Sequence, residues 1–266
     1  MNFSRAIVRP PGANFAAGLT SATDGTPDLE LALQQHAHYC KVLRGCGLEL
    51  TRLDPDPAYP DGTFVEDAAI VTARGAILTR PGAPSRTGET DGVGEALRAF
   101  HPALHGAAVR RVEAPGTVDG GDVCDADGHF VIGVSARTNE DGANQLKDHL
   151  ESMDFSASII DIRASKTLLH LKTGIAYMGD GVWLVAAGVE RELESLARLD
   201  LRVLIPVSRE EAYAANCVRV NDSVLVPAGY PGVVAALRSN GLSPVLLDMS
   251  EFKKMDGGLS CLSLRF

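Results

Sequence analysis

Long apolar runs are missing from this sequence of 266 residues. No uninterrupted stretch reaches the length of about 20 residues that a membrane-spanning helix needs, so we expect no span and no membrane partner. The opening segment MNFSRAIVRPPG contains Arg5, Pro10 and Pro11 where a signal peptide would need a continuous apolar core. Both observations predict a soluble, cytoplasmic protein.

Positive charge is in deficit, with 25 Lys and Arg against 34 Asp and Glu and a formal net charge of −9. This balance opposes binding to a phosphate backbone, so no nucleic-acid partner is expected. It would suit a small cationic ligand. Many acidic proteins are acidic only for solubility, so the net charge does not distinguish this interpretation from the binding of a cationic ligand.

Cysteine pairs with the spacing of a metal site are absent as well. The 5 cysteines are odd in number and form no CxxC motif, which argues against a disulfide framework and a zinc knuckle. Reduced thiols are expected. No metal-ligand or nucleotide-binding spacing occurs, so we predict no metal and no organic cofactor. The cysteines are Cys40, Cys46, Cys124, Cys217 and Cys261.

Short apolar segments that predict strands outnumber the helical patterns. We expect strands near 6–8, 48–53, 64–71, 76–78, 109–112, 130–134, 158–161, 182–186, 203–205, 223–226 and 245–247. Helices are expected over 28–43, 93–100, 139–151, 190–197 and 232–240. Helix centres that recur every 40 to 60 residues or so indicate a circular array of α/β units in a single domain, 1–266. A doubly wound α/β sheet is the alternative, and paired strands between helices disfavour it.

Two residues could supply nucleophilic and acid–base chemistry. Cys261 follows a glycine pair in DGGLSC and opens a predicted strand, where glycines permit close approach of a ligand to the backbone. A small buried strand residue is the simpler interpretation of this cysteine. His170 lies between leucines, as hydrogen-bonded core histidines often do, and it is the best candidate partner for the thiol.

Carboxylates interrupt apolar sequence in two places. Glu66 and Asp67 lie in FVEDAAIV, and their burial would require cations or donors. No basic residue lies in that segment, so we interpret Asp67 as a ligand-binding group and not as half of a structural ion pair. Asp61, in a Pro-Asp-Gly turn, fits a structural role equally well. Asp119 and Asp122 belong to DGGD, a common turn sequence in which Asp122 could cap backbone amides.

Two arginines, Arg86 and Arg137, lie in loops after predicted strands, where a guanidinium fork can hold a carboxylate. Either one alone is typical of an ordinary surface charge. Combined with a buried acidic cluster, they would form a site that is negative at one end and positive at the other. Such a site complements an amino acid with a cationic side chain.

Seven ordered segments between residues 64 and 265 carry a family resemblance: FVEDAAIV, LTRPGAPSR, DGGDV, SARTN, LHLK, AYAANC and DGGLSCLSLR. The chain resembles a dimethylarginine dimethylaminohydrolase, of the superfamily that also holds arginine deiminases and amidinotransferases. The resemblance implies a single-domain α/β propeller with pseudo-fivefold symmetry, built from ββαβ-type units. It implies hydrolysis of N-ω-methylated arginines to citrulline and dimethylamine or methylamine, without a cofactor.

The resemblance also implies roles for individual residues. Cys261 would attack the guanidinium carbon to form a thiouronium, and His170 would protonate the departing amine and then activate water. Asp119 would orient the imidazole, at a position where some bacterial relatives carry Glu. The substrate would be bound through its guanidinium by Asp67 and Glu66, through its carboxylate by Arg86 and Arg137, and through its amine by Asp61 and the carbonyls of Leu19 and Met255.

The segment 12–25, which contains Leu19, would form a mobile lid over the site. Two alternatives stay open. Arginine deiminases and amidinotransferases are usually longer than this chain, and a noncatalytic arginine-binding protein would not need the thiol. The sequence leaves a homodimer open.

Overall fold

The computed structural model describes residues 2–100, 109–165, 168–189 and 199–266. Within these ranges the strands form five sheets of three strands each. The sheets, in strand order, are β15(Leu264–Arg265)–β1(Arg5–Val8)–β2(Glu49–Arg52), β3(Ala69–Thr72)–β4(Gly75–Leu78)–β5(Arg110–Arg111), β6(Val123–Ala126)–β7(His129–Val134)–β8(Ser156–Asp161), β9(Ile175–Gly179)–β10(Val182–Ala186)–β11(Val203–Val207) and β12(Val218–Val220)–β13(Ser223–Pro227)–β14(Ser243–Leu247).

All five sheets share one pairing pattern. The central strand pairs antiparallel on one side and parallel on the other. A parallel pair needs a crossover, and in four of the five sheets a helix among the described residues supplies it. The helices are α1 (Leu29–Gly45) between β1 and β2, α2 (Thr90–Phe100) between β4 and β5, α3 (Glu140–Glu151) between β7 and β8, and α6 (Pro231–Ser239) between β13 and β14. The helix expected at 190–197 lies outside the described residues.

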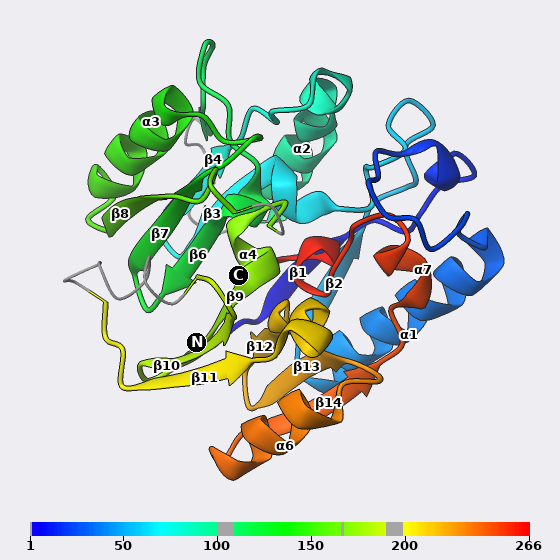
Figure 1. The fold of residues 1–266 in the computed structure, drawn as a ribbon. Coiled ribbons are helices and arrows are strands. Elements are labelled where there is room, and N and C mark those ends of the chain that lie inside the picture. Colours follow the sequence, from blue (N-terminus) through cyan, green and yellow to red (C-terminus); the bar gives the residue numbers. More distant parts are fainter. Residues whose placement is uncertain (1, 101–108, 166–167, 190–198) are drawn as a thin grey trace.

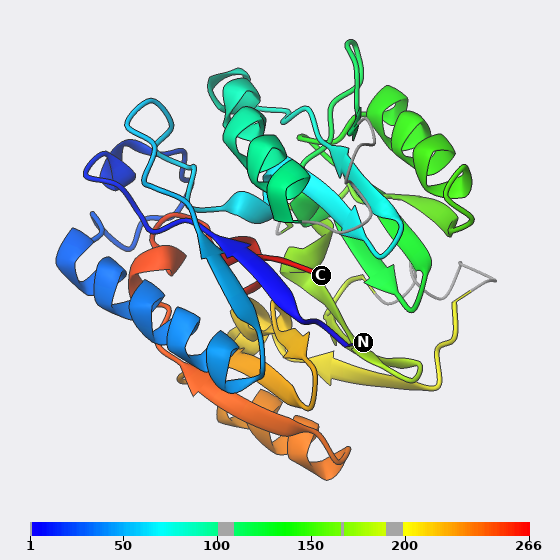
Figure 2. The same ribbon diagram turned by 180° about the vertical axis from the view of Figure 1, so that it is seen from behind.

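The main helices lie at the periphery and the strands lie inside them (Figures 1 and 2). Their caps explain where they begin. The Asp28 carboxylate accepts the N–H groups of Glu30 and Leu31 at the start of α1, and Asn139 accepts the N–H of Gly142 in α3. The buried faces of these helices pack on the sheets in separate apolar clusters. None of the helices in the described ranges has the length and hydropathy that a bilayer-spanning helix needs.

The two ends of the described chain meet in one sheet. Strand β15 pairs antiparallel with β1, and the N–H groups of Ser4 and Arg5 donate to the carbonyl of Phe266 at 2.9 and 2.8 Å. Figure 2 shows the two ends side by side. The first sheet is therefore built from residues at both ends of the sequence.

The short segments that carry the site are turns. They are the helical turns α4 (Leu171–Gly174) and α7 (Ser250–Lys253), and the 3-10 turns η1 (Phe15–Ala17), η2 (Val65–Ala68), η3 (Pro84–Glu89), η5 (Gly120–Asp122), η6 (Arg209–Ala215) and η7 (Ser260–Leu262).

The predicted strand over 64–71 is wrong in its first half, because the N–H of Asp67 bonds back to the carbonyl of Phe64 and closes η2. Cys261 likewise lies in η7, before β15 and not at its start. The short strands β6, β9 and β12 were not predicted.

Candidate active site

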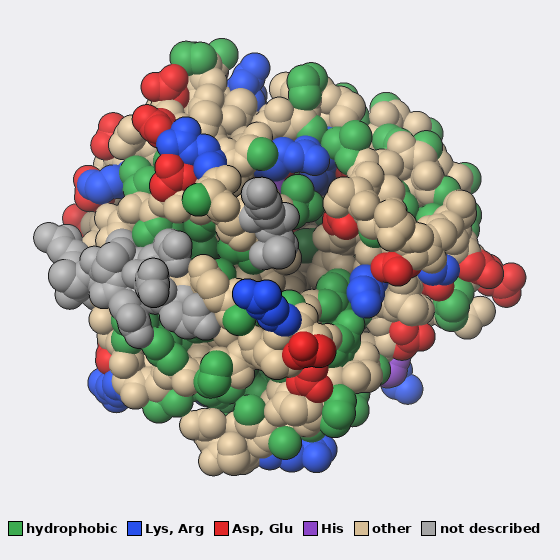
Figure 3. All heavy atoms as spheres, viewed as in Figure 1, with side chains coloured by type: hydrophobic (Ala, Val, Ile, Leu, Met, Phe, Trp, Pro, Cys, Tyr) green, Lys and Arg blue, Asp and Glu red, His purple; other side chains and the backbone are tan. Residues whose placement is uncertain are grey.

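A cavity of about 230 Å³ brings together most of the predicted site residues. The turns that border it lie near the centre of the view in Figure 1, and Figure 3 shows that this face is hollowed there. Two predicted residues, Asp119 and Glu66, are not part of its lining. The lining consists of Leu19, Thr20, Ser21, Asp61, Phe64, Asp67, Arg86, Arg137, Leu169, His170, Met255, Asp256, Gly257 and Cys261.

Cys261 is half-buried in η7 and borders this cavity. Burial raises the pKa of its thiol to about 12, and the carboxylates of Glu66 and Asp67 act in the same direction. The backbone of Gly258 and the ammonium of Lys172 oppose the rise in pKa. Without a ligand, the sulfur is therefore a neutral thiol at neutral pH, and it becomes a nucleophile only when positive charge comes close.

His170 caps the N-terminus of α4 and lies beside Asp119. Its Nε2 donates to Asp119 Oδ2 at 3.0 Å. Burial by itself would lower the pKa of this imidazole, but the carboxylates of Asp122, Asp67 and Asp119 together raise it to about 9. At neutral pH the ring carries a proton that it can donate.

Asp119 is fully buried, and its surroundings fix it in place. Its Oδ1 accepts the N–H of Gly82 at 2.8 Å, and its own N–H donates to Thr138 Oγ1 at 3.1 Å. Position 82 has no room for a side chain, since a Cβ there would lie 2.1 Å from the carbonyl oxygen of Arg137. The loop geometry thus holds the carboxylate that binds His170.

Asp122 is a structural residue, and it binds the backbone of Leu171, the residue after His170. Its Oδ1 accepts the N–H of Leu171 at 2.9 Å, and its Oδ2 accepts the hydroxyls of Ser135 and Thr138 at 2.6 and 2.7 Å. Burial raises the pKa of Asp122 to about 6. The alternative that this residue caps a backbone amide is confirmed, and the amide belongs to the turn that carries His170.

Asp67 forms a buried ion pair, so the expectation that it has no basic partner is wrong. Its Oδ2 lies 2.7 Å from Arg86 Nη1, and its Oδ1 accepts the N–H of Gly121 at 2.8 Å. Burial opposes ionisation, but Arg86 and then His170 outweigh it and lower the pKa of Asp67 to about 2. Arg86 also holds Glu89, at 2.8 Å between Nη2 and Oε2. The sequence analysis missed Glu89, although it lies three residues after Arg86 in the same turn, η3.

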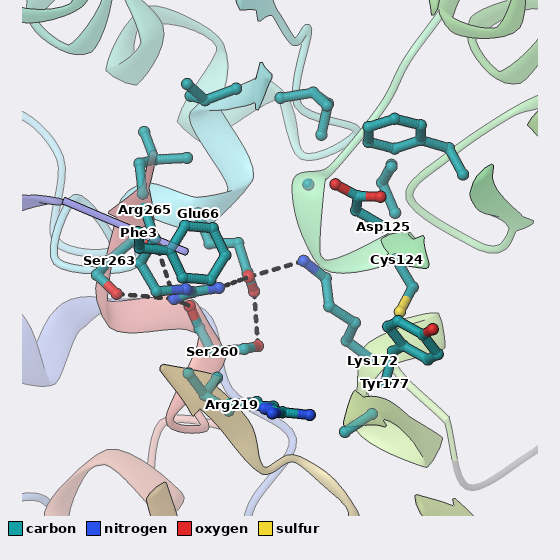
Figure 4. Close-up of a pocket in the computed structure, with 18 of the residues that line it drawn as sticks. Phe3, Glu66, Cys124, Asp125, Lys172, Tyr177, Arg219, Ser260, Ser263 and Arg265 are labelled. Atoms are coloured by element: carbon teal, nitrogen blue, oxygen red, sulfur yellow. Dashed lines mark hydrogen bonds and ion pairs between the residues drawn. The ribbon is translucent and has the colours of Figure 1, made fainter. Parts of the chain in front are cut away.

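Glu66 points away from this cavity, which corrects the expectation that it lies beside Asp67 at the guanidinium. Its carboxylate binds Lys172 Nζ at 2.7 Å, Ser260 Oγ at 2.7 Å and Arg265 Nη2 at 3.4 Å. These groups border a second cavity of about 140 Å³ (Figure 4). The side chains of Glu66 and Asp67 therefore point to opposite sides of η2. Glu66 binds Ser260, the residue just before Cys261.

The segment around Leu19 borders the cavity and is held by two carboxylates. Asp61 accepts the N–H of Leu19 at 3.1 and 3.2 Å through its two oxygens. Asp256 accepts the N–H of Ser21 at 2.6 Å, and Thr20 Oγ1 donates to the carbonyl of Lys254 at 2.9 Å. Asp256 has a φ of 56°, a conformation that favours Asp, Asn or Gly. The sequence prediction missed this contact.

Arg137 contributes the uncommitted positive charge of the cavity. Its guanidinium has no hydrogen bond or ion pair to the described part of the chain, whereas Arg86 is held by two carboxylates. Its backbone N–H donates to Ser135 Oγ at 2.9 Å, which fixes the loop. Of the two predicted carboxylate-binding arginines, Arg137 is the one free to bind an anionic group.

One cluster among the described residues has ligand atoms close enough for a metal ion. The side chains of Asp67, Asp119 and His170 offer atoms that all lie within 4.8 Å of one another. The same three side chains already bind Arg86, the N–H of Gly121 and one another.

The chain is similar to known proteins along nearly its whole length. Residues 56–204 match the family model of arginine deiminase. The chain is 44% identical over 264 residues to N(G),N(G)-dimethylarginine dimethylaminohydrolase of Pseudomonas aeruginosa, covering 99% of this chain and 100% of that protein. The chain belongs to the dimethylarginine dimethylaminohydrolase family. A dimethylarginine dimethylaminohydrolase of Streptomyces coelicolor is 37% identical over 267 residues, which cover 100% of this chain and 98% of that protein.

Solved structures of this family share the fold. The Pseudomonas aeruginosa protein, as a cysteine-to-serine mutant complexed with citrulline, gives a TM-score of 0.92 at 42% identity and covers 100% of both chains. A dimethylarginine dimethylaminohydrolase with histidine replaced by glycine, in an adduct with S-methyl-L-thiocitrulline, gives 0.91 at 42% identity over 99% of this chain and 100% of that one. The mixed α/β fold with five small sheets is that of the family.

Proposed function

We propose that this protein hydrolyses N-ω-methylated arginines to citrulline and dimethylamine or methylamine through a covalent intermediate on Cys261. The observation that carries the proposal is a single cavity that holds a thiol, a protonated imidazole, a buried carboxylate and a free arginine. Its fold is shared with a family member complexed with citrulline. The substrate is a small cationic amino acid, with no nucleic acid or membrane involved.

The charges of the cavity residues determine the order of the proton transfers in the proposed mechanism. A guanidinium bound at Asp67 brings positive charge to Cys261, which offsets the carboxylates that raise the thiol pKa, so the thiol releases its proton to solvent water. The thiolate then attacks the guanidinium carbon. His170 donates its proton to the departing amine, which leaves a thiouronium on the sulfur. The neutral imidazole next takes a proton from water as the oxygen attacks. The C–S bond then breaks, the thiolate returns, and the new hydroxyl group releases its proton to solvent to leave the urea carbonyl of citrulline.

The remaining groups bind the amino-acid end of the substrate. Arg137 is free to pair with the α-carboxylate, while Asp61 and the carbonyls of Leu19 and Met255 face the α-amine. Arg86 borders the carboxylate position and holds Asp67 in its ionised form. Glu66 acts indirectly by holding Ser260.

We further infer that the five sheets are the blades of one pseudo-fivefold α/β propeller domain. The common pairing pattern and the repeated helical crossovers support this arrangement. A cytoplasmic location is supported by the free thiols, which suit a reducing compartment. A homodimer stays a prediction.

The function is tested by incubating the protein with asymmetric dimethylarginine, monomethylarginine and arginine in parallel. Citrulline and the released amine are both quantified. Citrulline with dimethylamine or methylamine from the methylated substrates is expected. Ammonia release from arginine alone would indicate a deiminase, amidino transfer to an added amine would indicate an amidinotransferase, and binding without turnover would indicate a binding protein.

Arg137→Ala should remove most of the preference for substrates with an α-carboxylate. Truncating one partner of a desolvated charge pair costs about 2 to 5 kcal/mol, and the half-exposed position of Arg137 places its effect near the lower end. The measurement compares kcat/KM for dimethylarginine and for its decarboxylated analogue. Equal discrimination in the variant and the wild type would place the carboxylate elsewhere.

Asp67→Asn should lower kcat/KM by about a hundredfold to a thousandfold, because it removes the countercharge of the guanidinium. It should also lower the melting temperature, since Arg86 would lose one of two buried partners. Steady-state kinetics beside a thermal melt separate the two effects. A lower melting temperature with unchanged kcat/KM would make Asp67 purely structural.

A further inference from the structure

A buried asparagine outside the cavity joins the two turns that carry the thiol and the imidazole. Asn216 follows η6, is 7% exposed and is not part of the cavity lining. Its Nδ2 donates to the carbonyl of Lys172 at 2.9 Å and to Ser260 Oγ at 3.1 Å. Its Oδ1 accepts the N–H of Ser260 at 3.0 Å. One amide thus binds the residue two positions after His170 and the residue just before Cys261.

The segment before Cys261 has a glycine, Gly258, at the position where the Asn216 side chain packs against it. A Cβ at Gly258 would lie 2.4 Å from Asn216 Oδ1, so the side chain packs directly against the glycine backbone. The same backbone hydrogen-bonds the Cys261 sulfur and lowers its pKa against the effect of burial. Asn216 therefore contacts the segment that governs both the place and the charge of the thiol.

A second side chain, that of Glu66, also connects the two turns. The Glu66 carboxylate joins Lys172 Nζ and Ser260 Oγ, each at 2.7 Å (Figure 4). This bridge reaches Lys172 through a long flexible side chain, whereas Asn216 holds its backbone carbonyl. No backbone hydrogen bond among the described residues joins α4 directly to η7. The rigid connection between the two turns is thus the asparagine amide.

We propose that Asn216 is a positioning residue that sets the spacing between the Cys261 thiol and the His170 imidazole. The inference rests on the proposed function, in which both groups act on one substrate. Proton transfer and nucleophilic attack depend steeply on geometry, and a displacement of about 1 Å can cost a hundredfold in rate. In the proposed function, substrate binding depends on Asp67 and Arg137, and the side chain of Asn216 has no hydrogen bond to either of these two described residues.

The test uses Asn216→Ala in the full-length protein, with Asn221→Ala as the matched control. Asn221 also bridges backbone groups, accepting the N–H of Phe3 at 2.8 Å and donating to the carbonyls of Phe3 and Cys46 at 3.0 and 2.8 Å. It lies outside the cavity lining. Both variants lose the hydrogen bonds of a partly or wholly buried amide, so both should melt at a lower temperature.

Two readouts separate positioning from simple stabilisation. Asn216→Ala should lower kcat for dimethylarginine about tenfold to a hundredfold with KM within about twofold, and Asn221→Ala should change neither. Alkylation of Cys261 by iodoacetamide between pH 7 and 9.5 needs no substrate. Because the thiol pKa is about 12, the alkylation rate in this range measures a small thiolate fraction. The rate should fall at every pH only in Asn216→Ala, because Gly258, whose backbone lowers that pKa, loses the side chain that packs against it.

Equal kcat and equal alkylation profiles in the two variants would overturn the proposal and leave Asn216 a structural residue. If Asn216→Ala does not fold, Asn216→Asp is used, since it keeps the acceptor for the Ser260 N–H and loses both donors. Absence of citrulline from the wild type, together with a lowered alkylation rate in the variant, would overturn the proposed function and not the positioning of the thiol.

Discussion

Turnover of methylated arginines is expected to fall by about 10⁴-fold or more when Cys261 is replaced by serine. A serine hydroxyl is far harder to deprotonate than a thiol, and the cavity offers no strong base to help it. His170 cannot serve, because its pKa of about 9 leaves it protonated at neutral pH. Steady-state citrulline formation measures the loss, and a thermal melt checks the fold.

Cys46→Ser is the control for this substitution. Cys46 is a half-buried free thiol that packs against the cluster around α1 and is not part of the cavity lining. It should keep wild-type turnover. Full activity of the Cys261→Ser protein, with serine verified by mass spectrometry, would remove this cysteine from the mechanism.

Replacement of His170 by alanine should stop the cycle after partial reaction and lower kcat by about 10³- to 10⁴-fold. Amine departure loses its proton donor and thiouronium hydrolysis loses its base, so a covalent adduct on Cys261 should accumulate. Rapid quenching followed by mass spectrometry measures that adduct. His129→Gln is the control, because His129 binds the hydroxyls of Ser156 and Ser158 in another part of the fold.

The same substitution should change how stability depends on pH. A folded-state pKa of about 9, above the ordinary 6.5, means that the carboxylates around His170 stabilise its protonated form. That contribution is complete below about pH 6.5 and is lost as the pH rises through 9. In His170→Ala, the free energy of unfolding should vary less across this window. An unchanged slope, or normal turnover without an adduct, would contradict the assigned protonation state.

Local pattern predicted most of the fold. Helices α1 and α3 combine amphipathic sequence with a capping Asp28 or Asn139, and these signals need no knowledge of distant residues. Strands β6 and β12 were not predicted, because they are short and carry polar residues such as Asp125 and Arg219. The repeat of strand and helix units was visible from spacing, whereas the pairing of β15 with β1 depends on contacts across the whole sequence.

The site was predictable in its residue types and less so in their pairing. Cys261, His170 and Arg137 were expected, and the structure brings all three to one cavity. The opposite directions of Glu66 and Asp67 could not be predicted, because they depend on how η2 meets Lys172 on one side and Arg86 on the other. Asn216 lies in the segment AYAANC of the family resemblance, but it carries no charge, so only its three-dimensional neighbours reveal what it holds.

The pairing of β15 with β1 has a consequence for the order in which the protein folds. Sheets such as β6–β7–β8 join neighbours along the chain and can form early, whereas β15 and β1 must close a loop that spans nearly the entire sequence. Cys261 lies just before β15, so the strand that follows its turn reaches its place only with that closure. We therefore expect activity to return later than secondary structure when the protein is diluted from denaturant.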